Sequence, residues 1–194
     1  MGWSGRAPAP PANEAGEVLT VGEGRGFAVE SVRGRLVFTA AHCLPRLSVP
    51  YPFAQQERTY WDLLSPLGQA PFVTSECCFV DLVSDLAVLG PPDDQELSSE
   101  YNAYEQLLTS SAALPTATVS TPSRIPFTGW LLSLEGVWFR CSISHNDGGL
   151  WIYDSTAPIV GGMSGSPILN EDGAATGVFV FKRKERRYPR RRRA

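Results

Sequence analysis

The stretch Gly162–Pro167, with the sequence GMSGSP, decides how this chain of 194 residues is interpreted. A serine flanked by glycines is suited to nucleophilic attack, because its small neighbours leave backbone N–H groups accessible to an oxyanion. Two stretches further upstream complete the pattern, namely Thr39–Cys43 (TAAHC) and Asp85–Leu89 (DLAVL). The chain therefore presents a histidine, an aspartate and a serine in an order that is known for Ser-His-Asp triads.

Each of the three residues has a defined task in such a triad. A serine hydroxyl is inert at neutral pH until a base takes its proton, and we predict that His42 is the base for Ser164. Asp85 is predicted to fix the tautomer of the imidazole and to stabilise the imidazolium. The predicted oxyanion hole consists of the backbone N–H groups of Gly162 and Ser164.

Each motif also has a plainer interpretation. Taken alone, Ser164 is a turn residue, His42 is a core histidine, and Asp85 is a carboxylate at the end of a strand. Asp81 competes with Asp85 for a place in the triad, but only Asp85 is followed by the apolar run LAVL. The occurrence of all three motifs in order favours the triad over the separate plain interpretations.

An α/β-hydrolase site is excluded by two features of the sequence. The Gly-x-Ser-x-Gly elbow of those enzymes needs a glycine at position 166, where this chain has Ser166. Those enzymes also need a histidine after the nucleophile, and no histidine follows Ser164. The other histidine, His145, lies in a turn-like stretch, 144–149, and is interpreted as a solvent-facing loop residue.

The fold class follows from short apolar runs that are separated by many of the 18 Gly and 16 Pro residues. Such punctuation favours short strands joined by turns. Six candidate strands precede Pro91, and six more lie between residues 117 and 181, with an Asn170–Gly173 hairpin loop among them. We therefore predict an all-β fold of two six-stranded antiparallel barrels. The alternative is that the second barrel, at the carboxyl end, is incomplete.

The predicted organisation divides the chain into five parts. The site residues are shared between the two barrels, so the site is expected in the cleft between them. The segment after Pro92 is acidic and contains residues that favour helices, so we predict a connector with one or two helical turns. The predicted parts are a flexible lead (1–14), a first barrel with His42 and Asp85 (15–92), the connector (93–117), a second barrel with Ser164 (118–181) and a basic tail (182–194).

Charge is distributed unevenly, since the tail has nine Lys or Arg residues and one acidic residue, whereas the rest has 8 basic and 19 acidic residues. The tail is a candidate contact for an acidic partner. Nucleic acid is not a predicted partner, because the tail has one aromatic residue, Tyr188, and the chain shows no nucleic-acid-binding motif.

No apolar run approaches the roughly 20 residues of a membrane span. The first residues also lack an apolar signal region, so the sequence favours a cytoplasmic location. The four cysteines, Cys43, Cys77, Cys78 and Cys141, form no CxxC pair, and with two histidines in the chain they indicate no metal site. We interpret the cysteines mainly as small buried hydrophobic residues.

Together the three motifs resemble those of the chymotrypsin-like serine peptidases of the trypsin fold, over about residues 15–181. TAAHC is the histidine signature of that family, DLAVL is similar to its aspartate strand, and GMSGSP resembles its nucleophile loop GDSGGP. The preceding run Tyr153–Thr156 (YDST) looks most similar to bacterial glutamyl endopeptidases. The resemblance implies a serine endopeptidase that cleaves polypeptides through an acyl-enzyme, without a metal or an organic cofactor.

The resemblance also implies where the substrate lies. Residues just before the nucleophile loop are expected to line the pocket for the substrate side chain, and the last apolar strand is expected to run beside the substrate. The uncharged Pro158 and Ile159 favour an apolar or small substrate side chain. The predicted substrate-binding residues are Ser155, Thr156, Pro158, Ile159, Val178 and Phe179.

Several positions depart from the family pattern. Met163 replaces the aspartate that pairs with a newly cleaved N-terminus in trypsins, and Cys43 lacks the usual disulfide partner on the preceding strand. Phe179 lies near the position where glutamyl endopeptidases have a histidine. The basic, Pro-containing tail cannot supply an apolar closing helix. The alternative prediction is therefore a catalytically weak or inactive module of the same fold that binds peptides or partner proteins.

Overall fold

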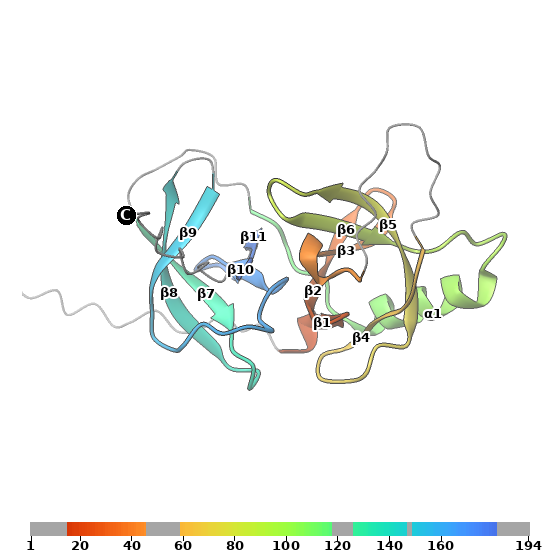
Figure 1. Cartoon of the computed structure of the whole chain (residues 1–194), viewed down its shortest axis with the longest axis horizontal. Helices are drawn as coiled ribbons and strands as arrows, with labels where there is room; N and C mark the ends of the chain where they lie inside the picture. The colour runs from red at the N-terminus through yellow and green to blue at the C-terminus, as the bar shows by residue number, and fades with distance from the viewer. Residues whose placement is uncertain (1–14, 46–58, 118–125, 147–148, 182–194) are drawn as a thin grey trace, which may run out of the picture.

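The computed structural model describes residues 15–45, 59–117, 126–146 and 149–181. Within these ranges the chain forms two β units that lie side by side, as Figure 1 shows. The predicted lead and tail lie outside the described residues. Within the ranges that are described, no helix is both long enough and apolar enough to cross a membrane.

The first unit is a closed antiparallel barrel with the strand order β1-β2-β3-β6-β5-β4. Its interior is an apolar cluster that includes Val37, Leu64 and Leu89, all fully buried. Strand alternation sends these side chains inward, and closure leaves no free strand edge. The strands are β1 (Val18–Val21), β2 (Gly24–Ser31), β3 (Gly34–Ala40), β4 (Thr59–Pro66), β5 (Val73–Asp81) and β6 (Leu86–Gly90).

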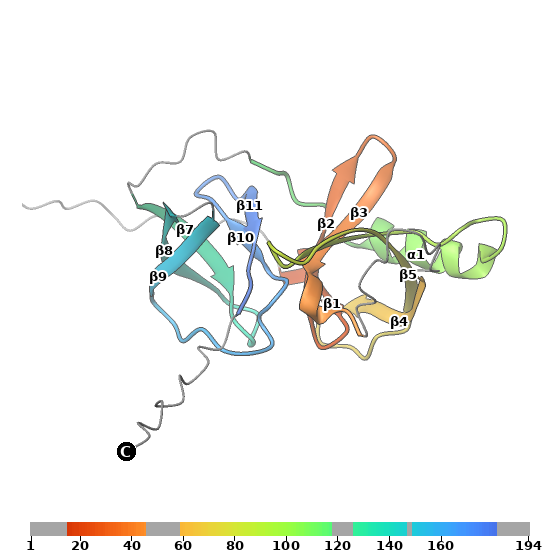
Figure 2. The ribbon, with the colours of Figure 1, turned by 45° about the horizontal axis from the view of Figure 1, so that its top comes forward.

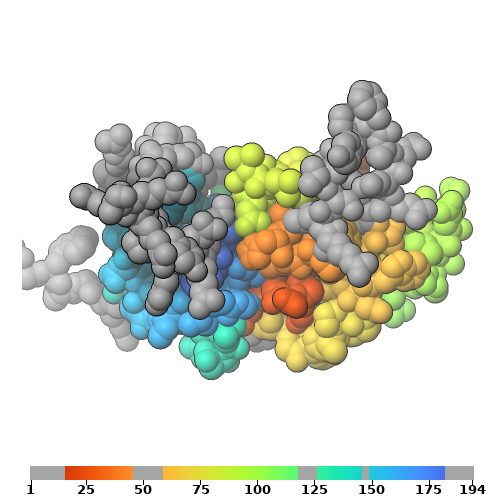
Figure 3. Space-filling model, viewed as in Figure 1, coloured from red at the N-terminus to blue at the C-terminus, as the bar shows by residue number. Residues whose placement is uncertain are grey.

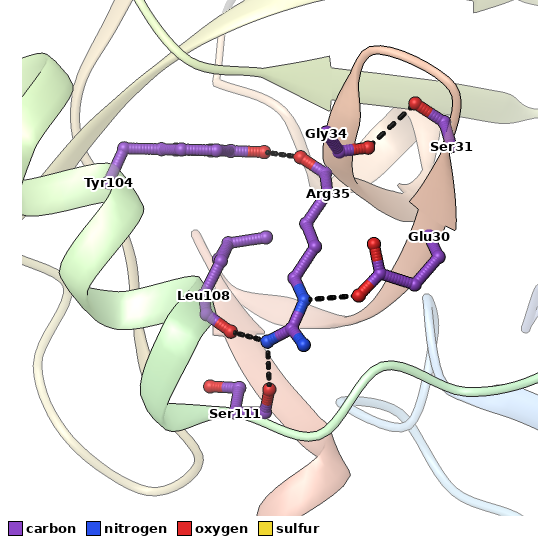
Figure 4. Close-up of polar contacts among 7 residues, drawn as sticks. All are labelled: Glu30, Ser31, Gly34, Arg35, Tyr104, Leu108 and Ser111. Carbon is purple, nitrogen blue, oxygen red and sulfur yellow. Dashed lines mark hydrogen bonds and ion pairs between the residues drawn. The ribbon is translucent and has the colours of Figure 1, made fainter.

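A single helix, α1 (Ser98–Ser110), follows the barrel and packs on the side away from the second unit (Figures 1 and 2). Figure 4 shows how Arg35 of β3 fastens it: the guanidinium donates to the carbonyls of Leu108 and Ser111 and pairs with Glu30 at 2.7 Å. The hydroxyl of Tyr104 donates to the Arg35 carbonyl at 3.0 Å. A cation at the carboxyl end of a helix is favoured by the helix dipole.

The second unit is a curled five-stranded antiparallel sheet with the order β11-β10-β7-β8-β9. Its first hairpin pairs Phe127 with Ile143 and Leu132 with Trp138. Cores lie on both faces of the sheet, because alternate residues point to opposite sides. The strands are β7 (Phe127–Leu132), β8 (Trp138–Asn146), β9 (Gly149–Ser155), β10 (Pro167–Leu169) and β11 (Ala175–Val178).

The two units share one apolar cluster, in which Phe27 and Val29 of the barrel pack with Trp130, Leu169 and Ala175 of the sheet. Figure 3 shows the resulting contact, with the orange and red residues of the barrel against the blue residues of the sheet. The barrel that carries His42 and Asp85 and the sheet next to the Ser164 loop therefore pack against each other.

The architecture confirms the predicted all-β fold of the chymotrypsin type. The second unit has five strands within the described ranges, which agrees with the alternative of an incomplete second barrel. Asn170–Gly173 forms the predicted hairpin loop, with φ +79° at the glycine. The expected strand 117–121 lies mostly outside the described residues, and Ala117 itself is not in a strand.

Two local predictions differ from the structure. Helix α1 has 13 residues, more than the one or two turns expected, because Tyr104, Leu107 and Leu108 gain burial against the barrel. The stretch 144–149 is not a plain turn, since Ser144–Asn146 belongs to β8 and pairs with β9. His145 is therefore a half-buried strand residue.

Candidate active site

His42 and Asp85 are brought together by the pairing of β3 with β6. Ala40 at the end of β3 pairs with Leu86 at the start of β6. The short 3₁₀ helix after β3 (Ala41–Cys43) therefore lies beside the turn that precedes β6. The backbone N–H of Ala41 donates to the Asp85 carbonyl at 2.9 Å and locks this arrangement.

The two side chains form a specific hydrogen-bonded pair. His42 Nδ1 lies 2.8 Å from Asp85 Oδ2, and the backbone N–H of His42 donates to Asp85 Oδ1 at 2.9 Å. A carboxylate oxygen accepts, so Nδ1 carries the proton and Nε2 keeps its lone pair in the neutral ring. The Asp85 side chain is 14% exposed and that of His42 is 45% exposed. The carboxylate is therefore shielded from solvent, while part of the imidazole is accessible to it.

Asp81, the competing carboxylate, has a different task. Its Oδ1 accepts from the backbone N–H groups of Val83 at 2.8 Å and Ser84 at 3.3 Å. Hydrogen bonds from the Ser84 side chain and these two amides hold the pKa of Asp81 below its ordinary value. Asp81 thus closes the hairpin between β5 and β6, while Asp85 contacts His42.

Ser164 lies in the loop between β9 and β10 and is 5% exposed. Its Oγ accepts a hydrogen bond from the backbone N–H of Phe181 at 3.1 Å. Its carbonyl accepts from the backbone N–H of Arg25 at 2.8 Å and faces the thiol of Cys43 at 3.6 Å. Since Cys43 is the residue after His42, the serine loop lies against the element that carries the histidine.

Two glycines give the serine loop its backbone shape. Gly162 has φ +88° and Gly165 has φ +86°, both in the region that favours glycine. Gly162 is exposed, whereas a Cβ at Gly165 would lie 1.7 Å from the carbonyl oxygen of Arg25. The loop can therefore approach the barrel this closely only with glycine at position 165.

Met163 is fully buried between these glycines and packs in the same apolar cluster as Phe179 and Ile168. Its sulfur accepts from the backbone N–H of Val160 at 3.4 Å. Met163, which stands where trypsins have an aspartate, thus fixes the serine loop to the apolar cluster of the second unit.

Of the predicted substrate residues before the loop, Ser155 is the last residue of β9, and the other three follow it. Ser155 Oγ donates to the carbonyl of Ala157 at 2.8 Å, and the Thr156 hydroxyl donates to the carbonyl of Arg140 at 3.1 Å. Pro158 is exposed, while Ile159 is half-buried against the cluster that contains Met163. These residues are close to the serine loop in the chain, and Ile159 shares the apolar cluster of Met163.

Val178 and Phe179 lie on the other side of the loop. The Phe179 side chain is 7% exposed and belongs to the cluster of Met163, whereas Val178 packs toward the interface with the barrel. The Phe179 backbone bonds the loop twice, accepting from Gly165 N–H and donating to the Ser166 carbonyl, each at 2.8 Å. Its backbone, more than its ring, is what reaches the serine loop.

Cys43 has no disulfide partner because Gly24 stands opposite it. A Cβ at Gly24 would lie 2.2 Å from Cys43 Sγ and 2.9 Å from the Ser164 carbonyl. All four cysteines lie in the described residues, and none of them forms a disulfide. Burial raises the pKa of the Cys43 thiol, so it is a neutral contact for the serine loop.

Arg25 is a site residue that the sequence analysis missed. It is 4% exposed, and its guanidinium crosses from β2 to the second unit. The available signal was an arginine set in the apolar strand GRGFAV. Within the described residues, no group of three His, Cys, Asp or Glu side chains could hold a metal ion.

Residues 24–178 match the model of the trypsin-like peptidase domain family. This chain belongs to that family. Because the match begins at β2 and ends at β11, the trypsin-like peptidase domain spans both β units. Membership of a peptidase family implies peptide substrates.

Two solved structures are similar to this trypsin-like peptidase domain. The inactive form of the Rv3671c protease is 18% identical, with 88% of this chain and 86% of that chain covered and a TM-score of 0.46. The NS6 protease from murine norovirus 1 is 11% identical, with 91% and 88% covered and a TM-score of 0.48. No curated protein sequence matches this chain.

Proposed function

We propose that this trypsin-like peptidase domain is a serine endopeptidase with Ser164, His42 and Asp85 as its triad. The observation that carries the proposal is the His42–Asp85 pair at 2.8 Å, together with a serine loop that rests on the neighbouring Cys43. Because Nδ1 is engaged by the carboxylate, Nε2 is the ring atom with a lone pair for the serine proton.

The proposed reaction has two halves. Ser164 Oγ attacks the scissile carbonyl carbon while its proton passes to His42 Nε2, and the resulting oxyanion is bound by the N–H groups of Gly162 and Ser164. The C–N bond then breaks, and the proton passes from His42 to the leaving amine. A water molecule, deprotonated by His42, cleaves the acyl ester, which releases the acid and restores the Ser164 hydroxyl.

The amide of Phe181 has a place in this scheme. It donates to Ser164 Oγ at 3.1 Å, which leaves the hydroxyl proton available to donate elsewhere. A serine held in this way has a restricted rotamer, and restriction of the nucleophile lowers the entropic cost of attack.

The proposed substrate carries an apolar or small side chain at the cleaved bond. Pro158 and Ile159 are uncharged, and Ile159 packs against an apolar cluster with Ala157 and Phe181 at its margin. A charged substrate group placed there would lose hydration without gaining a partner. This preference is proposed for the same site and does not alter the roles of the triad.

The experiment is labelling of the full chain with a fluorophosphonate, followed by mass spectrometry of the modified peptide. We expect one adduct, at Ser164, and its loss in Ser164→Ala, since removal of a triad nucleophile costs about 10⁶ in turnover. A probe with a leucine side chain should react faster than one with a lysine side chain. The control is Ser99→Ala, at an exposed serine of α1, which should be labelled like the wild type.

Cooperative unfolding of every variant is measured in parallel, so that lack of labelling is read only from folded protein. A folded wild-type chain that takes no label contradicts the proposal. That result favours the second candidate, a non-catalytic module that binds peptides, for which the supporting observation is that Ser164 is only 5% exposed.

A further inference from the structure

Arg25 is a buried cation that is satisfied by carbonyls of the second unit. Its guanidinium donates to the Leu132 carbonyl and the Ser133 carbonyl, each at 2.9 Å. It also donates weakly to Ser166 Oγ at 3.5 Å. Burial of a charge is costly unless its donors are satisfied, so these contacts tie the position of the cation to the end of β7.

The backbone of the same residue contacts the serine loop. The Arg25 N–H donates to the Ser164 carbonyl at 2.8 Å, and Gly165 packs directly on the Arg25 carbonyl. That carbonyl in turn accepts from the hydroxyl of Thr39 at 2.6 Å. Thr39 lies on β3, three residues before His42, so the contacts lead from the serine loop to the histidine.

One residue therefore links three segments that are far apart in the sequence. These are the end of β3, the turn after β7 and the loop with Ser164. The planar guanidinium suits two neighbouring carbonyls, because its N–H groups are arranged in a fixed fork. The charge persists despite burial, which lowers the pKa of Arg25, and nearby Glu135 opposes that lowering.

We propose that Arg25 is a positioning residue, which sets the Ser164 loop in register with the barrel that carries His42 and Asp85. The inference rests on the proposed function, since it deepens the account of the same site. Arg25 does not touch the reacting atoms, and it acts through the backbone of Ser164 and the side chain of Ser166. Its loss is expected to slow chemistry more than it weakens substrate binding.

The test compares Arg25→Met with Arg35→Met. Arg35 also donates to two backbone carbonyls, those of Leu108 and Ser111, as Figure 4 shows. These contacts lie at α1, on the side of the barrel away from the second unit (Figure 1). Each variant therefore loses two guanidinium–carbonyl bonds at a different place, and Arg35→Met also loses the ion pair with Glu30. Each is studied well below its own unfolding midpoint, with the labelling rate, kcat and KM measured on the full chain.

We expect Arg25→Met to lower kcat and the labelling rate by about 10- to 100-fold with little change in KM, because small misplacements of a nucleophile have effects of this size. Arg35→Met should react like the wild type. Arg25→Lys keeps the charge but not the fork, so its rate should lie between those of Met and wild type. If Arg25→Met does not fold, Arg25→Lys alone provides the comparison with Arg35→Met.

A wild-type labelling rate in folded Arg25→Met, or in Arg25→Lys where only that variant folds, overturns the inference and leaves the proposed function intact. If the wild type itself takes no label, the proposed function fails, and hydrogen exchange decides the inference. Faster exchange in residues 160–168 of Arg25→Met, but not of Arg35→Met, supports the positioning role. Unchanged exchange there overturns it.

Discussion

The closed barrel and the open sheet hold their parts of the site in different ways. Within the barrel, the pairing of β3 with β6 is sufficient to bring His42 to Asp85, and the pair is made by hydrogen bonds inside one unit. The loop of Ser164, in contrast, is bonded on one side by Phe179 and Phe181 and on the other by Arg25 of the barrel. The histidine–aspartate pair is thus a property of one unit, whereas the place of the serine is a property of the interface.

Because of this difference, substitutions in the barrel and substitutions at the interface are expected to affect different parts of the site. A substitution in the barrel that spares the pair leaves the His42 ring oriented, because the closed barrel has no free edge to rearrange. A substitution at the interface alters the placement of Ser164 without touching the His42–Asp85 pair. Substitutions that break the His42–Asp85 pair should therefore change the orientation of the His42 ring, and those at the interface should change the placement of Ser164.

Among the changes that test this comparison, the largest effect is expected from Asp85→Asn, which disrupts the pair inside the barrel. The amide can donate to the ring, so the imidazole takes the other tautomer, and the turnover is expected to fall by about 10⁴. The fall is measured as the rate of ester or peptide hydrolysis. The matched control is Asp81→Asn on the same hairpin, which should keep the wild-type rate because Asp81 accepts from Val83 and Ser84. Equal losses in both variants would refute the assignment of the carboxylate.

A smaller effect, on stability, is expected from Gly165→Ala at the interface. The new Cβ would meet the Arg25 carbonyl at 1.7 Å, and the residue has φ +86°. The backbone strain costs about 1–2 kcal/mol, and the overpacking adds about 1–3 kcal/mol. Urea unfolding measures the sum.

Gly162→Ala is the matched comparison, because its φ of +88° is nearly the same but its nearest neighbour is the Leu134 side chain at 3.5 Å. Only the strain of about 1–2 kcal/mol is expected there. If both alanine variants lose the same stability, contact with the barrel does not restrict Gly165, and the contrast between the two units loses its clearest physical basis.

The last prediction concerns Cys141, in the core of the second unit, and the free energy of unfolding at alkaline pH. At neutral pH this effect is absent, so it is the smallest under ordinary conditions. Burial raises the pKa of Cys141 from 9.0 to about 12. The folded state then binds the thiol proton more tightly than the unfolded state, so this stabilisation is complete below about pH 9 and is lost as the pH rises toward about 12. In Cys141→Ala the free energy of unfolding should fall less steeply over that window, as urea titrations at several pH values would show. Parallel curves for the two proteins would contradict this role of the thiol.

Much of the site was accessible from local patterns. His42, Asp85 and Ser164 were predicted from three short motifs, and the Asn170–Gly173 hairpin from its turn residues. The structure brings His42 and Asp85 within 2.8 Å. The hairpin prediction is confirmed, because a turn needs particular residue types at adjacent positions. The catalytic role of His42, Asp85 and Ser164 stays a prediction.

The rest could not be read from such patterns. Arg25 contacts Leu132 and Ser166 across separations of 107 and 141 residues, and no local periodicity marks a contact of that kind. The length of α1 depended on its packing against the barrel, which adds stability beyond its intrinsic propensity. The support that the Phe181 amide gives to Ser164 Oγ is likewise a contact of backbone, which carries no residue signature.

By itself, the amino-acid sequence determined the all-β class and the glycines of the serine loop, and it supplied the three residues of the proposed triad. Hydrophobic alternation and steric demands on the backbone act over a few residues, so they are written in the local order of the chain. Only the tertiary structure decided that Arg25 joins the serine loop to the barrel and that the Phe181 amide bonds Ser164 Oγ. Those outcomes depend on which strands pair and which surfaces pack, and such choices are made by the whole chain at once.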